Sequence, residues 1–174
     1  MKWEIAEDRM TPVGFYELLE RHRLLPHSPE MLPRIADMAN AARFFEITDN
    51  GTTVGHVVVS GIIPQHSADF DLIPNPVYFK RGQYEGVMLD CLLPVVSAFF
   101  ESGIGRLNSA VPESRSRTKH ALLALGFKKE GVMRRAARFR GRHAEDVLVM
   151  GMIASDMREP ADILEPAEVC DGTV

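Results

Sequence analysis

The chain has 174 residues, of which 45% are hydrophobic and 25% are charged, and its net charge is -4. This length suits one domain with an ordinary core, and the composition excludes a disordered or fibrous protein. No apolar run is long enough to cross a bilayer, and the two cysteines, Cys91 and Cys170, are too few for a disulfide framework.

The first half of the chain predicts a strand, two helices and an antiparallel run of strands. Thr11 before Pro12 marks a helix start, because threonine caps free amides and proline fits the first helical position. A Ser-Pro pair at 28–29 repeats this signal, and Asn50 before Gly51 predicts a hairpin turn. The expected elements are a strand at 3–8, a helix from 12 to about 22, a helix from 28 to about 41, and strands at 43–48, 52–63 and 68–73.

The second half predicts two helices that alternate with strands. The first has an apolar stripe at helical spacing. We expect Ser114 or Ser116 to cap the second helix and Gly126 to end it. The expected elements are a helix at 84–102, a strand at 106–111, a helix that ends at 125, and strands at 132–140 and 147–153.

The predicted order is β-α-α-β-β-β-α-β-α-β-β, which favours an α/β (α+β) fold with helices on both faces of a mixed central sheet. We expect a single domain over residues 1–155. Residues 156–174 contain six acidic residues and one arginine, and we expect an acidic, loosely ordered tail there.

Positive charge is concentrated between Arg106 and Arg142, where eleven lysines and arginines and two glutamates give a net charge of +9. Such a stretch indicates an anionic ligand or partner, and a solvated surface is the alternative. Nucleic-acid binding is the weakest hypothesis. Only Phe127 and Phe139 supply interleaved aromatic rings, and the sequence has no helix-turn-helix or zinc-finger spacing.

The run from Leu125 to Arg134 reads Leu-Gly-Phe-Lys-Lys-Glu-Gly-Val-Met-Arg. It resembles the leucine-glycine-phenylalanine and glutamate-glycine signature near the C-terminus of the GNAT superfamily of acyl-CoA N-acyltransferases. In particular it resembles the branch that acetylates ribosomal proteins, polyamines and some antibiotics. The resemblance spans residues 3–153 and is strongest over 106–152. It implies a GNAT-like fold, acetyl-CoA as co-substrate, and an amine acceptor on a protein, peptide or small molecule.

The loop before the long helix resembles the GNAT segment that binds the diphosphate of CoA through helix N-terminal amides. The chain matches that pattern at Arg81 and Gly86, whereas Tyr84 replaces a glycine and Glu85 adds an unfavourable charge. An ordinary strand-to-helix turn is the alternative. The cofactor-binding residues that the resemblance implies are Arg81, Gly82, Gln83, Tyr84, Glu85, Gly86 and, in place of a CoA-contacting asparagine, Arg115.

The resemblance also implies a backbone N–H between residues 70 and 79 that polarises the thioester carbonyl. Leu122 stands where many GNAT enzymes have the tyrosine that protonates the departing thiolate, so the usual general acid is missing. We expect the general base to be Asp71, or else Asp69, which share one face of their strand. The alternative is that both lie on a solvated strand face. Further candidates are His66 and Glu46.

Two classes of function are therefore open. One is an acetyl-CoA-dependent N-acetyltransferase. The other is a catalytically degenerate GNAT-like binding or structural module, of the kind that occurs in phage genomes, which Tyr84, Glu85 and Leu122 favour. We expect a cytoplasmic protein without a metal site, because the N-terminus has no apolar signal-peptide centre and no metal-ligand spacing occurs. A homodimer is an alternative to a monomer.

Overall fold

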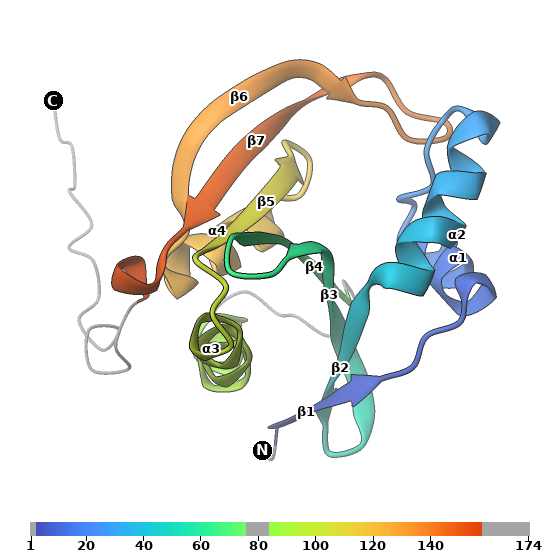
Figure 1. The fold of residues 1–174 in the computed structure, drawn as a ribbon. Coiled ribbons are helices and arrows are strands. Elements are labelled where there is room, and N and C mark those ends of the chain that lie inside the picture. Colours follow the sequence, from blue (N-terminus) through green and yellow to red (C-terminus); the bar gives the residue numbers. More distant parts are fainter. Residues whose placement is uncertain (1–2, 76–83, 158–174) are drawn as a thin grey trace, which may run out of the picture.

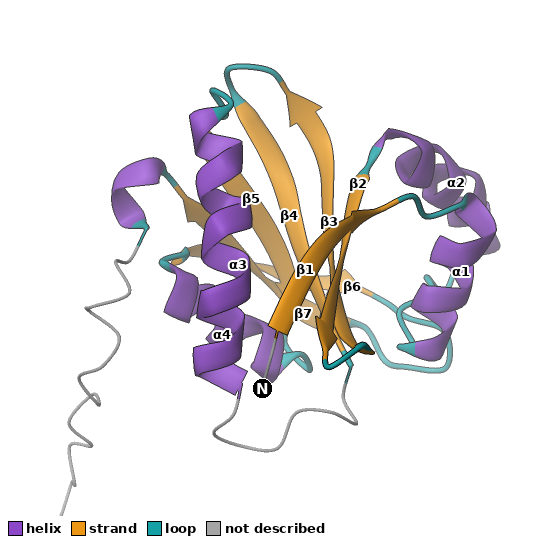
Figure 2. Cartoon of the chain, turned by 90° about the horizontal axis from the view of Figure 1, so that it is seen from below, coloured by secondary structure: helices purple, strands orange, loops and turns teal. Residues whose placement is uncertain are grey.

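The computed structural model describes residues 3–75 and 84–157, which form a seven-stranded mixed sheet with strand order β1-β2-β3-β4-β5-β7-β6. Helices α3 and α4 cover one face of the sheet, and α1 and α2 cover the other (Figures 1 and 2). This confirms the predicted fold class. The elements are β1 (Trp3–Asp8), α1 (Pro12–Arg21), α2 (Leu32–Ala41), β2 (Arg43–Asp49), β3 (Thr52–Ile63), β4 (Ser67–Pro74), α3 (Tyr84–Glu101), β5 (Arg106–Pro112), α4 (Ser116–Leu125), β6 (Lys128–Ala137) and β7 (Glu145–Met152).

Side chains that alternate along the strands supply a separate core to each face of the sheet. On β4, Phe70 and Leu72 belong to the core beneath α3 and α4, whereas Ile73 packs with Phe15 beneath α1 and α2. Asp71 alternates with Phe70 and Leu72. It therefore lies on the face that α1 and α2 cover, which we call the α1–α2 face.

The parallel strands β4 and β5 pair over only three residues, from Ser67 with Arg106 to Asp69 with Asn108. Both strands continue beyond the last pair, β4 to Pro74 and β5 to Pro112. The sheet is therefore split between residues 70–74 of β4 and 109–112 of β5, a region that we call the gap. Helix α4 begins just after β5 ends, so its N-terminus lies at the open end of the gap.

The second predicted helix begins later than expected. Residues Pro29–Met31 form a 3₁₀ turn, and α2 begins at Leu32. Pro33 explains the delay, because it has no N–H to donate to the carbonyl of residue 29, as an α-helix begun at the Ser-Pro pair would require. The proline instead occupies the first turn of α2, where an N–H is not needed.

The predicted serine cap of α4 is wrong. Its N-cap is Arg115, with no capping bond from that side chain. Ser114 is bound elsewhere, since its N–H donates to Glu145 Oε2 (2.9 Å) and its hydroxyl accepts from Arg142 (3.2 Å). The N-terminal amides of α4 are thus not covered by a serine side chain.

Strand β6 begins and ends earlier than predicted, at Lys128 and Ala137. The pairing with β7 has a break in register between Met133 and Ala137 and ends at the Ala137–Glu145 pair, beyond which Phe139 pairs with Pro26 instead. Within this break Arg135 has a φ of 52° and its N–H donates to Asp146 Oδ1 (2.8 Å) instead of continuing the ladder. None of the helices in the described part of the chain combines the length and apolar character that a bilayer crossing requires.

Candidate functional site

The backbone of Leu72 faces the gap. The N–H of Asn75 donates to the Val54 carbonyl on β3 (2.8 Å). Backbone N–H and carbonyl groups point to opposite sides in successive residues of a strand. Leu72 lies three positions before Asn75, so its N–H and carbonyl point the other way, toward β5. Its carbonyl accepts hydrogen bonds from Arg115 Nη2 (3.2 Å) and Thr118 Oγ1 (3.5 Å). The start of α4 thus contacts β4 across the gap, and the Leu72 N–H points into the same space.

A cavity of about 360 Å³ lies at the open end of the gap, lined by His22, Pro74 and residues 114–118. We call it the mouth cavity. Its lining includes the first residues of α4 and the cationic side chains of Arg115 and Arg117. The N-terminal amides of a helix attract an anion. Burial, reinforced by the nearby charge of Arg115, lowers the pKa of His22 to about 4. His22 is therefore neutral at pH 7, and the arginines supply the positive charge of this cavity.

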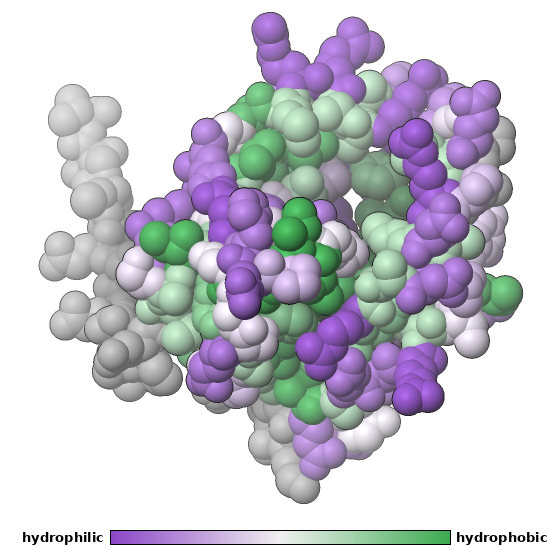
Figure 3. Space-filling model, in the orientation of Figure 1, coloured by the Kyte–Doolittle hydropathy of each residue, from purple (hydrophilic) through white to green (hydrophobic). Residues whose placement is uncertain are grey.

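A second cavity, of about 220 Å³, lies on the α1–α2 face of the same gap. We call it the α1-side cavity. Asp71 of β4 and Ala110 of β5 line it from the two sides of the gap, and Phe139 lines it from the chain after β6. The space-filling view is hollowed between the α1–α2 part of the molecule and the strands, and hydrophobic residues border the hollow (Figure 3). Arg115 lines both cavities and thus stands between them.

Backbone contacts hold Phe139 against the loop after α1. Phe139 forms an isolated antiparallel bridge with Pro26. On either side of it, the N–H of Arg140 donates to the Leu25 carbonyl (2.9 Å) and the N–H of His27 donates to the Arg138 carbonyl (3.0 Å). This pairing closes one wall of the α1-side cavity with residues that lie more than one hundred positions apart.

Asp71 is the carboxylate that the structure places at the gap. It lies two positions beyond the last β4–β5 pair and keeps partial exposure toward the cavity that it lines. Burial raises its pKa to about 6, while Arg115 opposes the rise and Asp69 adds to it. Asp71 is therefore mostly ionised at pH 7 to 8 but holds a proton more readily than an ordinary carboxylate, which suits a general base.

The other predicted base candidates do not line the two cavities. Asp69 is exposed and belongs to the last β4–β5 pair. His66 is exposed in the turn before β4, and its Nδ1 lies 2.9 Å from the Ser67 hydroxyl at the paired end of the strands. Glu46 accepts a hydrogen bond from Thr53 between β2 and β3. Of the four carboxylates and histidines predicted, only Asp71 meets the gap.

The predicted phosphate loop is described in part. Arg81, Gly82 and Gln83 lie outside the described residues. Tyr84, Glu85 and Gly86 form the first turn of α3.

Arg115, which aligns with a CoA-contacting residue, lies beside the gap, and its guanidinium donates to the Leu72 carbonyl. Its role in binding CoA stays a prediction. Leu122 is fully buried in the core beneath α3 and α4, where it packs and donates no proton.

Two histidines near the gap were not predicted as site residues. His56 on β3 is 8% exposed, burial lowers its pKa, and its Nδ1 has no hydrogen-bond partner among the described residues. His22 lines the mouth cavity and interacts electrostatically with both His56 and Arg115. The sequence signal for His56 is its position beside a run of three valines, where a polar side chain becomes buried.

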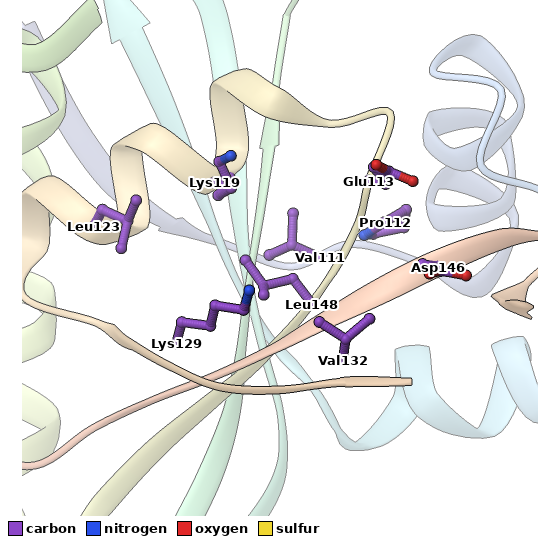
Figure 4. A pocket seen from close by; sticks show the side chains of 9 residues that line it. All are labelled: Val111, Pro112, Glu113, Lys119, Leu123, Lys129, Val132, Asp146 and Leu148. Atoms are coloured by element: carbon purple, nitrogen blue, oxygen red, sulfur yellow. The ribbon is translucent and has the colours of Figure 1, made fainter. Parts of the chain in front are cut away.

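A larger cavity, of about 440 Å³, lies between α4 and the β6–β7 hairpin (Figure 4). Val111 and Leu148 belong to its apolar lining, and its charged groups are Lys119, Lys129, Glu113 and Asp146. It contains no predicted site residue, and its mixture of charges favours neither an anion nor a cation. The described residues contain no group of His, Cys, Asp and Glu that could hold a metal ion.

No protein-family model and no curated protein matches the chain. Solved structures do match it. The ribosomal-protein-S5-alanine acetyltransferase from Vibrio fischeri has a TM-score of 0.63 and 20% identity, over 91% of this chain and 97% of that one. The spermidine/spermine N-acetyltransferase from Vibrio cholerae has a TM-score of 0.64 and 19% identity, over 88% and 94%. A GNAT-family acetyltransferase from Streptococcus pneumoniae has a TM-score of 0.59 and 20% identity, over 87% and 99%.

The chain therefore has the fold of the GNAT acetyltransferases, which confirms the resemblance predicted from the sequence at the level of the fold. At these identities the likeness does not extend to the substrate.

Proposed function

We propose that the chain is an acetyl-CoA-dependent N-acetyltransferase that moves an acetyl group to an amine. The observation that supports this most strongly is the position of Asp71. This carboxylate, whose pKa is raised to about 6, lies where the parallel strands separate. It lines the α1-side cavity, which Arg115 separates from the mouth cavity.

Each proposed role follows from the chemistry of a named group. Asp71 accepts a proton from the bound ammonium, which leaves a neutral amine nucleophile. The nitrogen then forms a bond to the thioester carbonyl carbon, the carbon–sulfur bond breaks, and CoA leaves as a thiolate that takes up the remaining proton directly or through water. The Leu72 N–H points into the gap and is the proposed donor to the carbonyl oxygen.

We place one phosphate group of acetyl-CoA at the open end of the gap. The mouth cavity supplies the N-terminal amides of α4 and the guanidinium groups of Arg115 and Arg117, which suit a phosphate. From the resemblance, the proposed diphosphate cradle is the segment Arg81 to Gly86. The cation of Arg115 also lies close enough to Asp71 to favour its ionised form.

The second candidate is a GNAT-like binding module without transferase activity. One observation favours it, since Arg115 and Thr118 already bond the Leu72 carbonyl, which is a group that an incoming ligand arm would otherwise meet. In this alternative the start of α4 keeps the gap closed to CoA. The two candidates differ in whether acetyl-CoA binds.

Calorimetry with acetyl-CoA and a thiol-release assay with amine acceptors test the proposal. We expect acetyl-CoA to bind and Asp71→Asn to lower kcat for thiol release about 10²- to 10⁴-fold with little change in acetyl-CoA affinity. The wild-type rate should rise with pH through about 6, and this step should disappear in Asp71→Asn. Asp69→Asn is the matched control, because this exposed neighbour on the same strand face does not line the cavities. It should leave kcat at pH 8 and acetyl-CoA affinity unchanged and should keep the pH step, moved to slightly lower pH by the loss of the Asp69 charge. Failure to bind acetyl-CoA at near-millimolar concentration would reject the transferase and favour the binding module.

A further inference from the structure

The α1-side cavity has a composition that points to a class of acceptor. Beyond the transferase activity proposed above, on which this inference rests, we infer that the acceptor is a small amine with one nitrogen and an apolar body. The lining of the cavity, its charge and its size each support this class over a polyamine.

Most of the described residues that line the cavity are apolar. Phe15 and Leu19 come from α1, Ile35 and Met38 from α2, and Phe139 from the chain after β6. Phe15, Leu19 and Ile35 are buried in the core of the α1–α2 face, whereas Met38 and Phe139 keep partial exposure. An apolar ligand that buries these partly exposed side chains removes apolar surface from water, which contributes favourably to the binding free energy.

Among the residues that the structure describes, two charged groups line the cavity, Asp71 and Arg115. One carboxylate can pair with one ammonium. A second ammonium on the same ligand would meet an apolar wall or the Arg115 guanidinium, and removing an unpaired charge from water is strongly unfavourable. The cavity therefore disfavours a polycation and accepts a single amine whose nitrogen approaches Asp71.

The size and closure of the cavity also favour a small ligand. Its volume of about 220 Å³ is below the roughly 300–1,000 Å³ of pockets for drug-sized molecules. The Pro26–Phe139 bridge joins the loop after α1 to the chain after β6 and closes one wall. An aromatic ring on a two-carbon amine arm suits such a space, with the ring against Phe139 and the nitrogen toward Asp71.

The test compares 2-phenylethylamine with spermidine as acceptors, in thiol release and in direct calorimetric binding to the full chain. We expect kcat/KM for 2-phenylethylamine to exceed that for spermidine at least about tenfold. Phe139→Ala should lower kcat/KM for 2-phenylethylamine by about tenfold or more while leaving acetyl-CoA affinity unchanged. Met133→Ala is the matched control. It removes an apolar side chain from β6 that is 46% exposed and does not line this cavity.

The outcomes separate this inference from the proposed function. Preference for spermidine, or equal loss of 2-phenylethylamine activity in Phe139→Ala and Met133→Ala, would overturn the inference and leave the transferase in place. If acetyl-CoA does not bind, the transferase fails, but calorimetry still tests the cavity. Binding of 2-phenylethylamine that Phe139→Ala weakens would uphold the cavity assignment, and tighter binding of spermidine or no amine binding would reject it.

Discussion

Asp71 makes the folded state less stable at neutral pH than a neutral side chain would. Its folded pKa of about 6 lies above the ordinary value of 3.8 because of burial, so the folded state binds the proton more tightly than the unfolded state does. The resulting stability is fully present below about pH 4 and is lost as pH rises through about 6.

We therefore expect Asp71→Asn to raise the free energy of unfolding at pH 8 by up to about 3 kcal/mol, and by much less at pH 4. The figure is an upper bound, because Asp71 keeps partial exposure toward its cavity. Urea unfolding of both proteins at the two pH values measures the difference. The same gain at pH 4 and pH 8 would show that packing and not ionisation is responsible.

Strand alternation in the sequence correctly places Asp69 and Asp71 on one face, but it does not distinguish them. Their difference arises from the last β4–β5 pair, between Asp69 and Asn108, which is a contact between distant parts of the chain. The direction of the Arg115 side chain is likewise set by its bond to Leu72, 43 positions earlier. Residue types and faces were predictable, whereas the point at which the strands separate was not.

At the scale of elements, the chain after α3 and the chain after α4 each contain a glycine with positive φ, Gly103 and Gly126, and the two can be compared. Gly126 has a φ of 112°, and a Cβ there would lie 2.2 Å from the Asp156 carbonyl oxygen. Gly103, after α3, has a φ of 94°, and a Cβ added there would have no other atom within 4 Å. Both positions disfavour an L side chain, but only Gly126 adds a backbone clash.

We expect Gly103→Ala to lower the free energy of unfolding by about 1–2 kcal/mol through backbone strain alone. Gly126→Ala should cost at least about 1–2 kcal/mol more, because Asp156 must move away. Urea unfolding of the two variants gives the comparison. An equal decrease in the free energy of unfolding for the two variants would show that the backbone around Asp156 shifts to accept the Cβ without a loss of stability.

Elements that depend on local signals were predicted correctly. The Thr11 hydroxyl accepts from the Gly14 N–H (3.1 Å) at the start of α1, and Asn50 and Gly51 adopt positive φ in the β2–β3 turn. The serine cap of α4 was wrong because Ser114 binds Glu145, which lies 31 positions later. Local patterns therefore located the helices and turns, while the start of α2 was changed by the nearby Pro33 and the cap of α4 by a long-range bond.

At the scale of the whole molecule, the basic stretch from 106 to 142 is dispersed by folding. Arg106 pairs with Glu130, Lys128 pairs with Asp156, and Arg142 Nη1 lies 3.8 Å from Glu145 Oε1. Arg115 and Arg117 line the mouth cavity. Three cations of the block that the sequence shows are thus held in ion pairs within the folded chain, which weakens the case for a continuous nucleic-acid-binding surface.

The central claim is that the gap between β4 and β5 receives the arm of CoA. A crystal structure of the chain soaked with CoA tests it most directly. We expect the arm between Leu72 and Ala110, with the diphosphate at the N-terminal end of α3 and Arg115 moved from the Leu72 carbonyl or bonded to CoA. CoA bound away from the gap, or a gap still bridged by Arg115 with no ligand in it, would contradict the claim.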